Sequence, residues 1–259
     1  MKHMPLPIML ANLDRPLTRA HLGALPRERA EQIFVKNLRE GMDAINSMEA
    51  VLIKDQIEQM LAQNLDWLRG GTFLLDGGTM YRDVLKLADP KLGPKVEAKQ
   101  RFNPKDKAAV NAYLAALMSY IQDRGINFVL TCHAAFAWEM VTTVVDGEPK
   151  KQLARTKQVY PKFDDIAFER ANISLLMFKR CECGKNIVSQ DGTCTGQGDP
   201  TDLRAEESGV HQGRKHMTRI VTCKFNTAVE GTSWEDLDYK TLHTLCFDPK
   251  KAKALLEAM

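Results

Sequence analysis

Thr72-Phe73-Leu74-Leu75-Asp76 is a short apolar run that ends in a carboxylate, and Asn127-Phe128-Val129-Leu130-Thr131-Cys132-His133 is a second apolar run about fifty residues later. Each run follows a segment with helical spacing of apolar residues, over 47–68 and 104–124, and glycine separates helix from strand both times. This repetition predicts a parallel sheet with crossover helices. Neither run alternates with polar residues, so we expect helices on both faces of the sheet.

The rest of the chain extends this pattern at both ends. Residues 7–14 read as a buried strand that ends at Asp14, and residues 33–35 as another strand. From about residue 170 the sequence pattern predicts short strands with turns between them, at 173–178, 187–189, 219–225 and 241–246. A short helix is expected at 250–259. We therefore expect a single α/β domain over residues 1–259, with a mostly parallel sheet, flanking helices, late antiparallel strands and an exposed β-hairpin excursion at about 181–216.

Composition bounds the classes of protein to which the chain can belong. The 259 residues are 44% hydrophobic and 27% charged, which is ordinary for a globular chain with a full core. A net charge of +3 neither demands nor excludes nucleic acid as a partner. No apolar run approaches the roughly 18 residues that span a bilayer, so no membrane partner is expected. Pro5, Pro7 and Asp14 interrupt the only early apolar stretch, which argues against a signal peptide and favours the cytoplasm.

Four segments together carry a resemblance to a known family. They are the strand that ends at Asp14, Leu74-Leu75-Asp76, the 125–133 segment after a long helix, and a late Lys224-Phe225-Asn226 with Gly231. Their order is similar to that of the RecA-like P-loop ATPases, in particular the phage recombination ATPases and the AAA-family phage nucleotide-binding proteins. The resemblance implies an oligomeric protein that uses ATP and Mg²⁺ to act on single-stranded DNA in phage recombination or replication, in the host cytoplasm.

One hallmark of that family does not occur in the sequence. No G-x-x-x-x-G-K-[ST] motif is present, and Gly184-Lys185 is no substitute because Lys179 stands where the motif needs its first glycine. The resemblance begins at the strand after the helix that normally follows this loop. Either a preceding segment is missing or the chain is a degenerate member. We expect feeble or no ATPase activity, since the loop supplies the main electrostatic stabilisation of the phosphates.

The resemblance assigns three residues at strand ends to the nucleotide. Asp76 would direct the Mg²⁺ shell through water, with capping of the Gly77-Gly78 turn as the alternative. Asp14 would position the attacking water, unless it only begins the turn at Arg15-Pro16. His133 would sense the γ-phosphate by donating a hydrogen bond to it.

Further basic residues are candidates for contacts beyond the nucleotide. After His133, residues 134–160 would be a mobile loop facing DNA, with Lys150, Lys151, Arg155 and Lys157 neutralising phosphates and Tyr160 stacking on a base. A solvated basic loop is the alternative. Lys224 resembles the cation that RecA-like neighbours insert into an adjoining subunit's site, although an exposed lysine on a strand is the more common explanation.

Three cysteines suggest half of a zinc site. Cys181, Cys183 and Cys194 lie close together in the sequence, and His211 or His216 would have to supply the fourth ligand. The spacing is not a standard one, and a reduced hairpin with incidental thiols is the alternative. Two other functions therefore stay open: a non-catalytic DNA-binding or scaffold protein that keeps the fold, and a zinc-stabilised nucleic-acid adaptor.

Overall fold

The computed structural model describes residues 3–14, 22–23, 25–39, 44–100, 104–145, 148–161, 169–181 and 214–258. Contacts divide the chain into two compact units, Met1–His133 with Lys162–Arg170, and Ala134–Pro161 with Ala171–Met259. A single domain was expected from the sequence.

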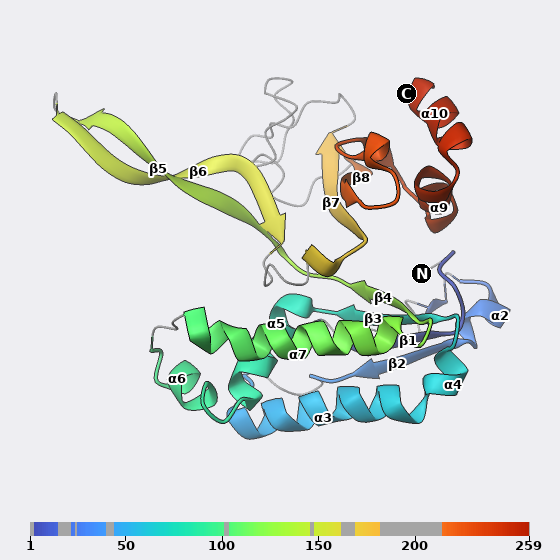
Figure 1. The fold of residues 1–259 in the computed structure, drawn as a ribbon, viewed down its shortest axis with the longest axis horizontal. Helices are drawn as coiled ribbons and strands as arrows, with labels where there is room; N and C mark the ends of the chain where they lie inside the picture. The colour runs from blue at the N-terminus through green and yellow to red at the C-terminus, as the bar shows by residue number, and fades with distance from the viewer. Residues whose placement is uncertain are drawn as a thin grey trace. The chain divides into compact units, whose positions relative to one another are not determined.

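The first unit is built on a four-stranded parallel sheet (Figure 1). Its strands are β1 (Ile8–Asn12), β2 (Ile33–Asn37), β3 (Thr72–Asp76) and β4 (Asn127–Leu130), in the order β2-β1-β3-β4. Asn12 at the end of β1 lies opposite Asn37 of β2 and Asp76 of β3, so these carboxyl ends align at one edge. The predicted parallel sheet is confirmed, and all four strands were expected from their apolar runs.

The helices of this unit follow the strands in the expected rhythm. They are α2 (Arg27–Ala30), α3 (Ser47–Gln63), α4 (Leu65–Leu68), α5 (Gly78–Ala88), α6 (Gly93–Glu97) and α7 (Pro104–Gln122). A capping box fixes the start of α3, where Asn46 accepts from the Glu49 amide and Glu49 accepts from the Asn46 amide. Helix α5 was not predicted, because Gly77-Gly78 reads as a turn that closes β3 rather than as the start of a helix.

One face of the sheet packs against α3, α5 and α7. Alternate residues of a strand share a face, and one buried cluster joins alternate strand residues to residues of these helices: Met9, Ala11, Leu13, Phe73 and Leu75 with Ile53, Ile57, Leu61, Tyr81, Val84, Leu114 and Leu117. Helical spacing therefore predicted most of the buried stripe of α3 and α7, with Val51, which is exposed, as an exception. The remaining alternate positions, such as Ile8, Leu10 and Leu74, are buried as well.

A short polar chain links the three helices through this core. The hydroxyl groups of Tyr81 and Tyr113 lie 3.2 Å apart, and Tyr113 donates to Glu58 Oε1 at 2.7 Å. Lys54 Nζ lies 2.9 Å from the same carboxylate. Burial alone would raise the pKa of Glu58, but the hydrogen bonds from Lys54 and Tyr113 and the charge of Lys54 together lower it.

In its described part, the second unit consists of antiparallel strands and three helices, of which one is a short 3-10 helix. The strands are β5 (Ala134–Val145), β6 (Glu148–Pro161), β7 (Ile173–Cys181), β8 (Arg214–Cys223) and β9 (Ser233–Glu235); the helices are η2 (Thr227–Val229), α9 (Tyr239–Phe247) and α10 (Pro249–Glu257). β5 pairs with β6, and β7-β8-β9 form a second sheet (Figure 1). The expected strands at 173–178 and 219–225 correspond to β7 and β8, and the C-terminal helix is confirmed, whereas the strand expected at 187–189 lies outside the described residues. The expected excursion at 181–216 falls almost entirely outside the described residues.

A second buried cluster joins this sheet to α9 and α10, through Ile220, Cys223, Val229, Leu245, Cys246 and Ala252. Cys223 and Cys246 are buried free thiols whose Sγ atoms lie 3.5 Å apart. Burial and the neighbouring Cys223 raise the pKa of Cys246 to about 12, so it stays a neutral thiol.

Two sequence predictions for this unit are wrong. Residues 134–160 form the hairpin β5–β6 and not a loop; the β-branched run before Asp146-Gly147 is a strong hairpin signal that the basic residues obscured. Residues 241–246 belong to helix α9 and not to a strand. Asp238 caps this helix by accepting from the Thr241 amide at 2.7 Å, and the spacing of Leu242, Leu245 and Cys246 is helical.

Replacing Tyr113 with phenylalanine tests the polar chain. The variant leaves the fully buried hydroxyl of Tyr81 without its partner, which costs about 1–3 kcal/mol of unfolding free energy. Chemical denaturation measures the difference. Tyr120→Phe on the same helix is the matched control, because the described residues supply no hydrogen bond to its hydroxyl. Equal stability of the two variants would contradict the account.

Glu58 gives the stability of the protein a defined pH dependence, which Glu58→Gln removes. Because the pKa of Glu58 is lowered on folding, its ionised form stabilises the protein at pH values above the ordinary glutamate pKa of 4.5. That contribution is lost as the pH falls through the lowered value. The stability difference between wild type and Glu58→Gln is therefore constant near neutrality and shrinks in acid. Urea denaturation across this range checks it, and a difference independent of pH would refute it.

Candidate functional site

Polar residues gather where β1, β3 and β4 end. Asp76 is the last residue of β3, Asp14 follows β1, and Thr131 and His133 follow β4. Backbone hydrogen bonds continue past the strands, from Leu13 N to Asp76 O at 2.9 Å and from Thr131 N to Leu75 O at 3.1 Å. These bonds bring the three chain segments together at the carboxyl edge of the sheet, which is where open parallel sheets bind ligands.

The carboxylate of Asp76 is oriented by Thr131. Its Oδ1 accepts a short hydrogen bond from Thr131 Oγ1, and this hydroxyl oxygen accepts in turn from the Gly77 amide at 3.1 Å. Among the described residues no hydrogen bond reaches Asp76 Oδ2. One carboxylate oxygen is therefore fixed by the protein while the other can take a ligand, a water or a hydrated cation.

Asp14 and His133 form a second pair at the same edge. His133 Nε2 lies 3.4 Å from Asp14 Oδ2, and both side chains are about half exposed or more. Asn12 positions Asp14 by accepting its backbone amide at 3.0 Å, and Thr79 accepts the His133 amide at 3.0 Å. The pair thus presents a carboxylate and an imidazole to solvent from two strand ends held by neighbouring side chains.

The glycine pair after Asp76 connects β3 directly to helix α5. Gly77 has φ +91°, the left-handed region that favours glycine. A Cβ on Gly78 would lie 2.6 Å from Leu130 Cδ1 and 2.7 Å from the carbonyl oxygen of Thr131. The absence of both side chains lets the first turn of α5 contact the end of β4, and Gly78 donates to Thr131 O at 2.7 Å. The positive end of the α5 dipole therefore belongs to this edge.

The structure brings three of the predicted site residues together in the first unit, and others belong to the second unit. Asp14, Asp76 and His133 meet in the first unit. Lys224 belongs to the second unit, where its backbone amide donates to Asn172 O at 2.9 Å in the turn after β8. Asn226, from the same late segment, caps η2 by accepting from the Ala228 amide at 3.2 Å.

The predicted DNA-contacting residues lie in β6. Lys150 and Lys151 are exposed and lie opposite Thr143 and Thr142 of β5. Arg155, Lys157 and Tyr160 belong to the same strand, with side chains outside the described part of the chain. Of the candidate zinc ligands, Cys181 ends β7 and its side chain is not described, while Cys183 and Cys194 lie outside the described residues.

A metal at the sheet edge would have few protein ligands. In the described ranges no three His, Cys, Asp or Glu side chains are grouped closely enough to hold an ion. Mg²⁺ commonly keeps several waters and uses one or two carboxylates with substrate phosphates. The donor set of Asp76, with Asp14 nearby, fits that mode and not an all-protein cage.

No helix of the described chain is long and apolar enough to cross a membrane.

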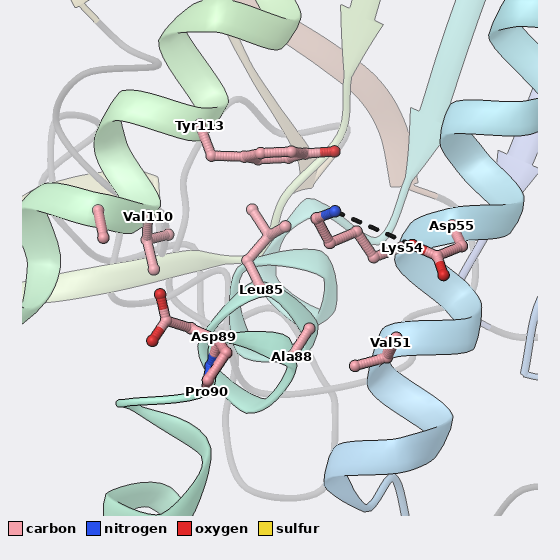
Figure 2. A pocket seen from close by; sticks show the side chains of 10 residues that line it. Val51, Lys54, Asp55, Leu85, Ala88, Asp89, Pro90, Val110 and Tyr113 are labelled. Atoms are coloured by element: carbon pink, nitrogen blue, oxygen red, sulfur yellow. Dashed lines mark ion pairs between the residues drawn. The ribbon is translucent and has the colours of Figure 1, made fainter.

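A cavity of about 230 Å³ between α3, α5 and α7 is a structural feature rather than this site (Figure 2). The ring of Tyr113 lies on one side of it, with Leu85 and the ammonium group of Lys54 facing its interior. Its charges have partners within the fold: Lys54 lies 2.9 Å from Glu58, and Asp89 accepts from the amides of Lys91 and Leu92. The described lining residues named here therefore use their charges in contacts within the protein.

The residues that hold the site together were not predicted from the sequence. Thr131 and Thr79 join β4 to β3 and to α5, and Asn12 holds Asp14. Thr131 lies at the end of an apolar run, two residues before His133. A hydroxyl group at that position was the one feature of the sequence that could have indicated its contact with Asp76. The contacts of Thr79 and Asn12 depend on the turn into α5 and on strand register, which the local sequence does not encode.

Gly78→Ala tests how tightly the turn is packed. The new Cβ would meet the backbone of Thr131, so β4 and α5 must move apart and the protein loses about 1–3 kcal/mol of stability. Gly125→Ala is the control, since Gly125 has φ +68° and open space around it, so that only backbone strain is added. Thermal denaturation of both variants and a crystal structure of Gly78→Ala would check this. An unshifted Thr131 in Gly78→Ala would contradict it.

Comparison of the chain with models of protein families, with curated proteins and with solved structures found no match. A function for the chain is therefore inferred from the chemistry of the sheet edge and of the exposed surfaces.

Proposed function

We propose that this chain is a RecA-like nucleotide-binding protein that acts on single-stranded DNA in phage recombination or replication. The observation that carries the proposal is the convergence of Asp14, Asp76 and His133 at the carboxyl edge of the parallel sheet, beside the start of α5. Parallel sheets bind nucleotides at this edge, and helix N-termini favour phosphate groups.

Asp76 is the residue that would hold Mg²⁺, through water. Thr131 fixes one of its oxygens, so the direction of the free oxygen is set before a ligand arrives. A bound Mg²⁺ supplies positive charge that offsets the negative charge of a triphosphate. Pre-orientation by a second residue is typical of groups that position a metal shell.

Asp14 and His133 have complementary roles in this proposal. The Asp14 carboxylate can orient a water molecule and accept its proton, as a general base does. The His133 imidazole can donate a hydrogen bond to a phosphate oxygen, and its backbone is tied to α5 through Thr79. A change at the phosphate would thus be felt where β4 leads into the hairpin β5–β6.

The sequence contains no phosphate-binding loop motif, and this limits the expected activity. Without the amides and lysine of such a loop, ATP binding is weak and hydrolysis is slow or absent. ATP turnover in the presence of single-stranded DNA measures this directly. Robust hydrolysis by the chain would contradict the expectation.

The hairpin β5–β6 supports the DNA part of the proposal and also a second candidate function. Lys150 and Lys151 are exposed on β6, and Met140 and Leu153, a cross-strand pair, are 60% and 63% exposed. Exposed cations on a strand suit contact with a phosphate backbone. If nucleotide does not bind, this hairpin favours a non-catalytic DNA-binding protein.

Asp76→Asn tests the nucleotide site. The variant keeps the shape and the hydrogen bond with Thr131 but removes the charge, so Mg²⁺-dependent binding of a fluorescent ATP analogue weakens about tenfold or more. Asp66→Asn is the control, since Asp66 is fully exposed at the surface of α4. Equal Mg²⁺-dependent binding by both variants would remove Asp76 from the site.

Lys150→Ala with Lys151→Ala tests the hairpin. Each lost phosphate contact reduces the slope of log affinity against log salt by about 0.7 for a single strand. Titration of labelled single-stranded DNA at several salt concentrations measures the slope. Lys36→Ala with Lys91→Ala removes the same charge from exposed positions of the first unit. If both double variants change the slope equally, the hairpin has no special role.

A further inference from the structure

An aromatic surface lies on the second unit, formed by Phe225, Tyr239, His243 and Phe247. The ring centroids of Phe225 and Phe247 are 4.5 Å apart, those of His243 and Phe247 are 4.8 Å apart, and those of Tyr239 and His243 are 6.2 Å apart. Phe225 and Phe247 are 48% and 50% exposed. Four neighbouring rings thus form one continuous, solvent-facing strip.

The helical period of α9 places three of these rings on its outer face. Tyr239, His243 and Phe247 follow one another at intervals of four residues, whereas Leu245 and Cys246 point into the buried cluster. The outward rings therefore do not complete the core of this unit. Exposed aromatic residues gathered on one face are a common mark of a binding surface.

The turn that carries Phe225 is held rigidly against α9. Asn226 donates from Nδ2 to Leu245 O at 2.7 Å and accepts from the Ala228 amide at 3.2 Å. The Lys224 amide donates to Asn172 O at 2.9 Å. These bonds on both sides of Phe225 keep its ring beside Phe247, so the surface is formed before any partner binds.

The charges around the rings favour one class of partner. Lys224, Lys240 and Lys250 are exposed close to the rings in sequence, and the nearby Asp238 and Asp248 cap α9 and α10 by accepting from the amides of Thr241 and Lys251. Rings flanked by cations suit bases joined by phosphates.

We infer that the aromatic surface stacks the bases of single-stranded nucleic acid, with the neighbouring lysines contacting its phosphates. The inference shares the DNA partner of the proposed function, but it uses neither the sheet edge nor the hairpin β5–β6. It also assigns Lys224 to a contact with nucleic acid, in place of the cation that the sequence resemblance implied.

The test compares a labelled oligo-dT with an abasic oligomer of the same length, in fluorescence anisotropy without nucleotide. Wild type binds oligo-dT more tightly, and Phe225→Ala and Phe247→Ala each weaken that binding roughly tenfold while leaving the abasic oligomer unchanged. Phe247→Leu keeps an apolar side chain without a ring and behaves as Phe247→Ala does. Phe34→Ala is the control, because Phe34 is 48% exposed on β2 of the first unit and should have no effect.

Four results would overturn the inference. They are equal binding of both oligomers by wild type, ring variants that match Phe34→Ala, wild-type affinity in Phe247→Leu, and self-association in sedimentation that Phe247→Ala abolishes. The last two would point to an apolar protein partner or to a second copy of the chain. If an alanine variant fails to fold, Phe247→Leu decides. Mg²⁺-dependent ATP binding by the wild type is measured separately. Its absence would contradict the proposed function and would leave the inference about the aromatic surface unaffected.

Discussion

The turn from β3 into α5 is the constraint on which the candidate site depends. Gly77 has a backbone conformation that residues other than glycine rarely adopt. A Cβ on Gly78 would overlap the backbone of Thr131. Because neither residue has a side chain, α5 begins immediately at the edge of the sheet. Thr131 can then reach Asp76, and Thr79 can reach the backbone of His133.

The parallel register supplies the other half of the geometry. Asn12 and Asp76 lie opposite each other at the ends of β1 and β3, so the residues that follow emerge side by side. Asn12 holds Asp14, which in turn lies 3.4 Å from His133. Three segments far apart in sequence are thereby linked by hydrogen bonds into one polar edge, while the core of α3, α5 and α7 supports the sheet from one face.

Sequence patterns predicted the elements better than the contacts between them. Apolar runs and helical spacing identified β1, β3, β4, α3 and α7 because those signals are local. The bond from Thr131 to Asp76 joins residues 55 positions apart and depends on strand order, which no local pattern encodes. Helix α5 was missed because its first residue is glycine. Helix α9 was taken for a strand because its β-branched and cysteine residues outweighed the spacing of Leu242 and Leu245.

The central claim is that Mg²⁺-nucleotide binds at the edge formed by Asp76, the glycine turn and His133. The most direct measurement is the change of backbone amide NMR signals when Mg²⁺-ATP is added to isotope-labelled protein. The account predicts that the largest shifts occur at Gly77, Gly78, Thr79 and His133. Shifts centred on the cavity around Tyr113, or no shifts at saturating Mg²⁺-ATP, would contradict it.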